Sequence, residues 1–358
     1  MPNPNAIVGL IARIDPPVVG AGTEMFRAYP DGFSIQLEGD RAVRLSPGDN
    51  AAAILEILDS RRQRGAPVYI EIDPRDRRIA RLLLPLTVLV TNVRSGPGEE
   101  FAIELEPSHA RHSLRQENPY FQEIITTLRD LHAKRAWAYV TEGDDHEIID
   151  VRPAPAPREP PLARERPAFL KRLWFCLIWL LRCMSPRKAA ATFNLVAAQS
   201  CNPLTAPAPC IPFLYPDDGC WARAHEMCRL MLGAGVYPRK VWIYGNLHTL
   251  TKNNPACFVN WGWHVAPTLC VRKWIIFSQE RVIDPALFSG PVSKQTWKSV
   301  QGDPNAQLYS THHNVYHRHY QPWHSDPNYV LTNQHLADYR DALKLRSINQ
   351  GPPPYNCP

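Results

Sequence analysis

The feature that most constrains the fold is a proline-rich segment near the middle of the chain, at residues 152–167. It reads RPAPAPREPPLARERP, a composition that favours extended, fairly stiff backbone with little means of packing. The chain has 358 residues, which is enough for two ordinary domains. We therefore predict an N-terminal domain over residues 1–151, a linker over 152–168 and a C-terminal domain over 169–358.

The composition is that of a globular protein without a strongly charged partner. Apolar residues make up 44% and charged residues 21% of the chain, as in folded domains. The net charge of +6 is mild and no basic stripe with interleaved aromatic residues is visible, so nucleic-acid binding is not predicted. Residues 1–6 lack a basic start followed by an apolar run, so no secretory signal peptide is expected. Leaderless secretion and a cytoplasmic location both stay open.

Residues 173–181, LWFCLIWLL, form the only membrane-like segment of the sequence. A helix needs about 20 apolar residues to cross a bilayer, and this run is much shorter. We therefore predict a core or interfacial helix over residues 170–183 and no transmembrane span.

The N-terminal domain is predicted to be a small mixed α+β domain. Helical spacing of apolar residues marks 51–64 and 120–134, and alternating or β-rich runs predict strands at 6–14, 33–45, 68–72, 79–93, 101–105, 138–140 and 148–151. The domain has no cysteine, glycine-rich phosphate loop or acid cluster. The sequence thus predicts no chemistry for it, and accessory, docking and inhibitory roles stay open.

The C-terminal domain is also predicted to be α+β. Beyond the helix that starts near Cys220, helices are expected at 188–199 and 333–345, with strands at 240–244, 258–271, 274–277 and 281–284. The stretch from Gly290 to the last helix is predicted to be irregular. This order of elements allows a helix to pack on an antiparallel sheet.

Residues 215–227, YPDDGCWARAHEM, place a cysteine at the predicted start of a helix. A turn-forming run precedes Cys220, and Asp217 or Asp218 is suited to cap the first turn. The partial positive charge at a helix start favours thiolate over thiol, so this is a good position for a nucleophile. A lone cysteine is nevertheless more often a small buried hydrophobe.

A cysteine nucleophile needs a base within hydrogen-bond reach and a third group that orients the base. His264 in WGWHVA and Asp284 in VIDP follow Cys220 on two predicted strands. A helix on an antiparallel sheet can bring these three side chains together. Taken singly, each is more often structural: His264 as a core histidine and Asp284 as a cap before Pro285.

Strand alternation predicts the surroundings of this histidine. It places Gly262, His264 and Ala266 on one face of the strand and Trp261 and Trp263 on the other. The two small residues would leave room for a substrate beside the imidazole. A rival base, the histidine five residues after the cysteine, would point away from the thiol.

The cysteines and the late histidines are further candidates. All nine cysteines lie in the C-terminal half, which suggests an oxidising compartment, and an odd count leaves at least one thiol unpaired in a monomer. The spacing of Cys201 and Cys210 permits a disulfide. A metal site is not predicted, because no carboxylate or cysteine is placed to complete a shell around His312, His313, His317, His319 and His324.

Several ordered motifs closely resemble those of bacterial protein glutaminase, the protein-glutamine deamidase family. They are Gln199-Ser200-Cys201 through Cys210, YPDDGCWARAH at 215–225, YGNL at 244–247, WGWHVA at 261–266, IDPALF at 283–288 and NVY at 314–316. The resemblance covers roughly residues 190–320. It implies a fold related to transglutaminases and papain-like enzymes, with Cys220 as nucleophile, His264 as base and acid, and Asp284 as the orienting carboxylate.

The resemblance further implies hydrolysis of protein-bound glutamine to glutamate through a thioester, with ammonia as the leaving group and no cofactor. The Cys220 backbone N–H would be one oxyanion donor. Acyl transfer to an amine, peptide-bond cleavage and a binding protein with an idle triad are the alternatives. An effector or toxin role, and inhibition of the site by the N-terminal domain until the linker is cut, stay open.

Overall fold

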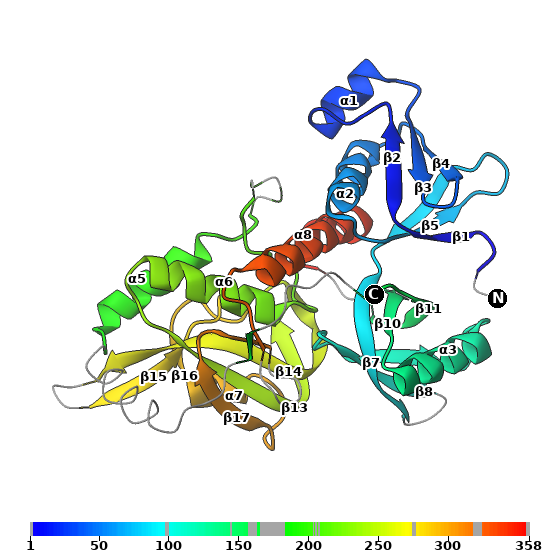
Figure 1. Ribbon diagram of the computed structural model, residues 1–358. Coiled ribbons are helices and arrows are strands. Elements are labelled where there is room, and N and C mark those ends of the chain that lie inside the picture. Colours follow the sequence, from blue (N-terminus) through cyan, green and yellow to red (C-terminus); the bar gives the residue numbers. More distant parts are fainter. Residues whose placement is uncertain are drawn as a thin grey trace. The chain divides into compact units, whose positions relative to one another are not determined.

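The computed structural model describes residues 3–96, 100–143, 145–156, 163–164, 183–202, 204, 206, 208–273, 277–317 and 324–355. The protein is mixed α+β, and the strands of its sheets pair antiparallel (Figure 1). Its residues form two compact units: unit 1 comprises Met1–Arg158 and Lys344–Asn349, and unit 2 comprises Glu159–Leu343 and Gln350–Pro358. The predicted domain boundaries at 151 and 168 stay predictions.

The first part of unit 1 contains two three-stranded sheets, in the orders β1-β5-β6 and β2-β3-β4. Their strands are β1 (Ala6–Gly9), β2 (Ile11–Asp15), β3 (Phe33–Leu37), β4 (Arg41–Leu45), β5 (Val68–Ile72) and β6 (Ile79–Leu83). The helices are α1 (Gly22–Ala28) and α2 (Ala51–Arg64). The helix predicted at 51–64 is α2, and its apolar face is confirmed, since Leu55 and Leu58 are fully buried in this core.

Two strands predicted in this part are each divided. Residues 6–14 contribute β1 and β2, which belong to different sheets. Residues 33–45 form a hairpin, because Gly39 and Asp40 adopt positive φ angles of 79° and 58° and turn the chain back. A turn of this hand matches the twist of the strands that it joins.

The second part of unit 1 is a five-stranded sheet covered by one helix. The order is β11-β10-β7-β8-β9, made of β7 (Leu86–Ser95), β8 (Glu100–Glu106), β9 (His112–Arg115), β10 (Trp137–Glu142) and β11 (Ile148–Pro153), with α3 (Phe121–Lys134) packed against it. The run predicted as one strand at 79–93 is β6 and β7. Pro85 lies between them and has no N–H to donate to a ladder.

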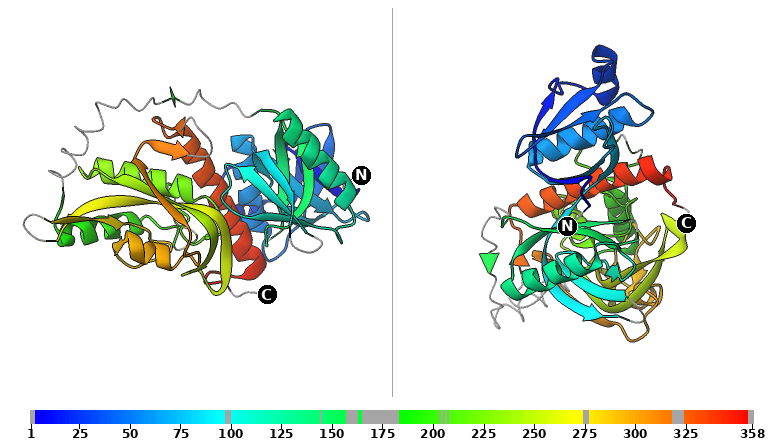
Figure 2. Two further views of the ribbon diagram at one scale, coloured as in Figure 1. Left: turned by 90° about the horizontal axis from the view of Figure 1, so that it is seen from below. Right: turned by 90° about the vertical axis from the view of Figure 1, so that its right-hand side faces the viewer.

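Unit 2 is built on a five-stranded sheet in the order β16-β15-β14-β13-β17. Its strands are β13 (Arg239–Thr251), β14 (Asn254–Arg272), β15 (Ser278–Val282), β16 (Val292–Ser293) and β17 (Gln307–His312). The helices α5 (Pro186–Ala197) and α6 (Cys220–Gly233) cover one face, and α7 (Lys294–Ser299) lies on the other (Figure 2). The predicted packing of a helix on an antiparallel sheet is therefore present.

The end of unit 2 differs from the irregular tail that the sequence predicted. β16, α7 and β17 all lie beyond Gly290, as do β18 (Val315–His317) and β19 (His324–Ser325). β19 pairs on one side with β18 and on the other with β12 (Ala163–Arg164). Short elements of this kind take their stability from packing rather than from their own periodicity, which explains why the pattern missed them. The last helix, α8 (Val330–Gln350), is longer than predicted.

Helix α8 contributes to both units. Its residues up to Leu343 belong to unit 2, whereas Lys344–Asn349 group with unit 1, where Leu345 and Ile348 join the hydrophobic core around α2. None of the helices in the described ranges is long and apolar enough to cross a membrane. The apolar helix predicted at 170–183 lies almost wholly outside the described residues, as do three residues of the strand predicted at 274–277.

Candidate active site

Cys220 is the first residue of helix α6, as the sequence predicted. The N-cap residue of the helix is Gly219, with φ at +84°, so neither preceding aspartate occupies the predicted N-cap position. The predicted cap is therefore wrong. A side chain at Gly219 would also collide with the ring of Tyr339, so glycine is required there both by backbone conformation and by space.

The turn before α6 is held from three directions. Arg223, one turn into the helix, donates from Nη1 to the carbonyl oxygen of Tyr215 over 3.0 Å. The Trp261 indole N–H of β14 donates to the carbonyl oxygen of Asp217 over 2.8 Å. The Tyr339 hydroxyl of α8 donates to the Asp218 carboxylate over 2.7 Å. Both aspartates thus take part in long-range contacts that help to fix the turn.

His264 of β14 and Asp284, which follows β15, form a buried pair. The His264 Nε2 atom lies 2.9 Å from Asp284 Oδ2. The same oxygen accepts a hydrogen bond of 2.8 Å from the indole N–H of Trp297 on α7. One carboxylate oxygen therefore holds both the imidazole and the indole, and fixes the orientation of the histidine ring.

The His264 ring is also placed between two indoles. It stacks on Trp261 with a centroid distance of 4.6 Å and on Trp297 with a distance of 5.4 Å. The predicted separation of Trp261 and His264 onto opposite strand faces is therefore wrong. The pairing of β13 with β14 shifts register between Tyr244 and Leu247, so the ladder is irregular next to this position.

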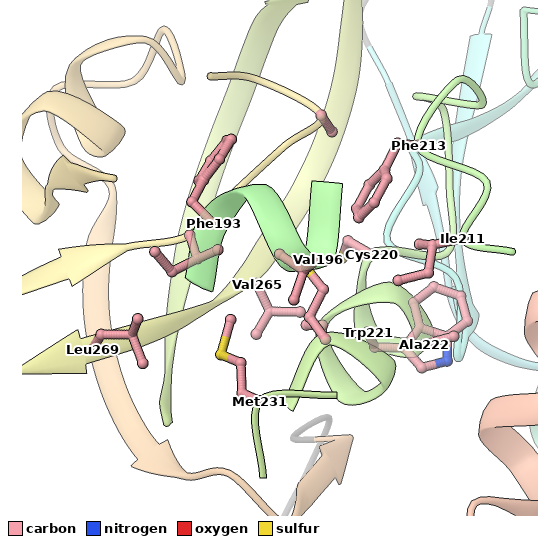
Figure 3. Packing of buried hydrophobic residues seen from close by; sticks show 14 of the residues in the cluster. Phe193, Val196, Ile211, Phe213, Cys220, Trp221, Ala222, Met231, Val265 and Leu269 are labelled. Carbon is pink, nitrogen blue, oxygen red and sulfur yellow. The ribbon is translucent and has the colours of Figure 1, made fainter. Parts of the chain in front are cut away.

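The structure brings the three predicted site residues together. The Cys220 sulfur and a ring nitrogen of His264 lie within 4.8 Å of one another. Because Asp284 engages Nε2, a proton exchanged with the thiol would pass through Nδ1. The thiol belongs to the hydrophobic cluster under α5 and α6, and Figure 3 shows it among Val196 and Ile211.

Burial sets the ionisation of the cysteine. It raises the pKa of Cys220 well above the ordinary value, the carboxylates of Asp218 and Asp284 raise it further, and nearby Arg223 opposes them. The thiolate predicted at the helix start is therefore not the favoured form here, because desolvation outweighs the helix dipole. Burial also acts against ionisation of Asp284, yet His264 and the Trp297 N–H hold the pKa of this carboxyl below its usual value.

The rival base, His225, is engaged elsewhere. Its Nδ1 lies 2.9 Å from Lys240 Nζ and its Nε2 lies 3.2 Å from the carbonyl oxygen of Asp326. Burial and the Lys240 ammonium lower the pKa of His225 to about 2. This histidine is buried, and the hydrogen-bond partners given for it are not residues of the candidate site.

The late histidines are dispersed among aromatic residues. His312 and His313 contact each other through their rings, at 4.0 Å between centroids, whereas the ring of His317 packs on Trp263 at 5.5 Å. Among the residues that the structure describes, these three do not form a group of metal ligands. His319 lies outside the described ranges.

Two disulfides are present among the described cysteines. Cys201–Cys210 is the one that the spacing permitted, and it closes the loop just before Ile211 of the site cluster. Cys183–Cys270 joins the chain before α5 to β14 and was not anticipated, since the two cysteines are 87 residues apart. Cys220 and Cys228 are free thiols.

Sequence reasoning missed Trp297, Arg223 and Tyr339, which hold the site. Trp297 lies in a stretch predicted to be irregular, and Tyr339 is 121 residues from its partner Asp218. Only Arg223 carried a signal, as a charged residue within an otherwise apolar helical turn. A buried arginine in such a place needs acceptors, and here they are backbone carbonyls.

Comparison with known proteins places the candidate site within a recognised family region. Residues 189–301 match a family model described as Glutaminase, and this range contains all three predicted site residues. This region of the chain is therefore similar to the glutaminase family. The resemblance to protein glutaminase is thereby confirmed over that range. No match was found among curated proteins.

Solved structures of protein glutaminase are similar to the chain. A crystal structure of pro-protein-glutaminase is 24% identical, covers 72% of this chain and 93% of its own, and has a TM-score of 0.54. A crystal structure of protein-glutaminase is 33% identical over 43% of this chain and 88% of its own, with a TM-score of 0.38. The solution structure of protein-glutaminase from Chryseobacterium proteolyticum is 31% identical over 47% and 89%, with a TM-score of 0.39.

Proposed function

We propose that the chain hydrolyses the side-chain carboxamide of protein-bound glutamine to glutamate, with Cys220 as nucleophile. The observation that carries the proposal is a thiol at a helix start within 4.8 Å of a His264 nitrogen, with that histidine bonded to Asp284. These residues lie inside the region that matches the glutaminase family. We also propose that unit 2 has the transglutaminase- and papain-like arrangement, because its nucleophile helix packs on an antiparallel sheet.

The proposed reaction has two halves. His264 takes the thiol proton, the thiolate attacks the glutamine carbonyl carbon, and the imidazolium returns the proton to nitrogen as the C–N bond breaks and ammonia leaves. Water then attacks the thioester, His264 takes one of its protons, and the C–S bond breaks to release glutamate and restore the thiol. The Cys220 backbone N–H at the start of α6 is the proposed oxyanion donor.

The buried cysteine suggests a latent state. Cys220 is only 1% exposed and its pKa is raised, so a protein substrate reaches the thiol only after a rearrangement. The fold match to pro-protein-glutaminase covers 72% of the chain, and unit 2 makes up only about half of it, so the match extends into unit 1. We therefore propose that unit 1 acts as an intramolecular inhibitor of the site.

The activity is tested with the purified chain on a denatured, glutamine-rich protein, with and without a primary amine. Ammonia release with conversion of glutamine to glutamate, lost in Cys220→Ala, is the expected result. Cys228→Ala is the matched control, because Cys228 is the other free thiol of the same helix and is also buried. Amine-linked peptides would make the enzyme a transglutaminase, and cleaved backbone would make it a protease.

Inhibition by unit 1 is tested by placing a cleavage site for a specific protease within residues 152–168. A cut is preferable to the isolated segment 186–358, which lacks Cys183 and its disulfide to Cys270. We expect the fragments to stay together after the cut, because Leu345 and Ile348 of α8 are packed in the core of unit 1. Activity should rise only when unit 1 is then digested further, and equal activity at every stage would contradict inhibition.

A further inference from the structure

A second cluster of histidine and carboxylate groups lies in unit 1, away from any residue assigned above. It consists of His112 on β9, Glu142 at the end of β10 and His146 in the turn before β11. His112 Nδ1 lies 2.6 Å from Glu142 Oε2, and His146 Nδ1 lies 3.1 Å from Glu142 Oε1. One ligand atom from each of the three residues falls within 4.8 Å of the other two.

The three side chains converge in a protected place. His112 is 2% and His146 8% exposed, and the Glu142 side chain is 11% exposed. A carboxylate between two imidazoles is a set of donors that suits a divalent transition-metal ion.

The backbone keeps His146 in the cluster at a conformational cost. This residue has φ at +62°, a left-handed conformation that is unfavourable for residues with a side chain. Its N–H donates to the carbonyl oxygen of Gly143, and its own carbonyl accepts the N–H of Ser113 on β9, over 3.1 Å. The second bond ties the turn to the strand that carries His112. Such strained positions are concentrated at functional sites.

The ring of His112 is oriented by a further partner. Its Nε2 lies 2.9 Å from the Ser108 hydroxyl, which leaves Nδ1 directed at Glu142. Metal-binding histidines commonly bond through their second nitrogen to a polar group that fixes the tautomer. Ser108 is itself buried, so this contact does not depend on a mobile surface side chain.

We propose that His112, Glu142 and His146 bind a divalent metal ion, with zinc the best fit. Ligand atoms about 2.1 Å from a tetrahedral zinc ion lie about 3.4 Å apart. The 3.1 Å between His146 Nδ1 and Glu142 is close to this value, whereas the 2.6 Å between His112 Nδ1 and Glu142 is shorter, so these two side chains would move apart by about 0.8 Å to admit the ion. Water supplies the fourth ligand. The ion replaces a proton shared between imidazole and carboxylate, and this proton is released to solvent. His112 keeps the proton on Nε2, which it donates to Ser108.

The inference is independent of the proposed deamidation. Its test uses the full chain with the Cys220→Ala substitution, because the Cys220 thiol could itself bind zinc. The protein is stripped with a chelator, titrated with zinc chloride, desalted and assayed for bound zinc by mass spectrometry. We expect one zinc ion per chain. His146→Gln and Glu142→Gln should each weaken zinc binding by at least about tenfold, since even the loss of a supporting residue has an effect of that size.

His132→Gln is the matched control in the same unit. His132 is on α3 and its Nδ1 bonds to the carbonyl oxygen of Val90, outside the cluster, so this variant should retain one zinc ion. Ser108→Ala keeps all three ligands and should weaken binding by about tenfold. Absence of bound zinc in the parent chain, or equal zinc in parent and ligand variants, would overturn the proposal.

Circular dichroism shows whether the ligand variants fold. If they do not, cobalt binding by the Cys220→Ala chain decides the question. A visible spectrum of tetrahedral Co²⁺ without a thiolate band supports nitrogen and oxygen ligation. An octahedral spectrum, a thiolate band or no binding argues against this site.

Discussion

Each unit of the protein contains a buried histidine–carboxylate pair, and the two pairs differ in what lies beside them. His264 and Asp284 in unit 2 are 2.9 Å apart, and His112 and Glu142 in unit 1 are 2.6 Å apart. In both pairs the imidazole counteracts burial and keeps the pKa of the carboxyl low. The distances alone therefore do not distinguish the two sites.

The two pairs differ in the third side chain that contacts the carboxylate. In unit 2 one carboxylate oxygen holds His264 and Trp297, so the acid orients a ring that lies beside the Cys220 sulfur. In unit 1 each oxygen of Glu142 faces a different imidazole, so the acid is the centre of the group. The first arrangement suits proton transfer to and from a thiol, and the second suits a cation.

Removing the thiol should have the largest effect. Cys220→Ala is expected to lower deamidation by about 10⁴-fold or more, because the covalent step is lost and only binding and oxyanion contacts remain. Ammonia release measures this effect. Cys228→Ala should keep near-normal activity, and loss of activity in both variants would mean that helix α6, rather than the nucleophile, was damaged.

Neutralising the orienting acid should come next. Asp284→Asn is expected to lower kcat by about 10³- to 10⁴-fold, because an amide no longer stabilises the imidazolium and favours the wrong tautomer. Steady-state kinetics on a glutamine-containing peptide measures it. A change in KM with kcat unchanged would mean that Asp284 does not orient the catalytic base. The contrast between Asp284 and Glu142 would then fail.

Trp297 should act through Asp284, as a positioning residue. Trp297→Phe keeps the ring beside His264 but loses the N–H bond to the carboxylate, and should lower kcat by about 10- to 100-fold. It should also shift the acid limb of the pH profile of kcat/KM to higher pH. The reason is that Asp284 loses one of the hydrogen bonds that lower its pKa. Trp242→Phe is the control: it breaks a buried 2.8 Å bond to Thr311 and should leave the profile unchanged.

The smallest effect is expected on the stability of unit 1 in acid. The pKa of Glu142 is lower in the folded protein than its ordinary 4.5, so its contribution to stability is present above that pH and is lost as pH falls below it. In the presence of chelator, we expect a loss of about 1–2 kcal/mol between pH 5 and pH 3 that is absent in Glu142→Gln. Hydrogen exchange of the β10 and β11 amides measures the stability of unit 1 at each pH. The same pH dependence in the parent chain and in Glu142→Gln would contradict the prediction.

Local sequence signals were reliable where local physics decides. The start of α6 at Cys220, the apolar faces of α2 and α3 and the packing of α6 on an antiparallel sheet follow from turn formers and periodicity. The motifs that resemble protein glutaminase carried the three site residues, and their roles stay predictions. Nothing in the sequence of unit 1 indicated that His112, Glu142 and His146 would meet, because they lie on different strands and a turn.

The sequence by itself determined that a cysteine begins a helix and that a histidine lies on a strand downstream, because turns and periodicity depend on neighbouring residues. The aspartate, predicted on a strand, lies just after β15. Only the tertiary structure decided the cap of α6, the face of β14 that carries Trp261, and the raised pKa of Cys220. Each of these depends on desolvation or on contacts between distant segments, such as Tyr339 with Asp218. Burial and long-range hydrogen bonds exist only once the chain has folded, and for that reason no local pattern encodes them.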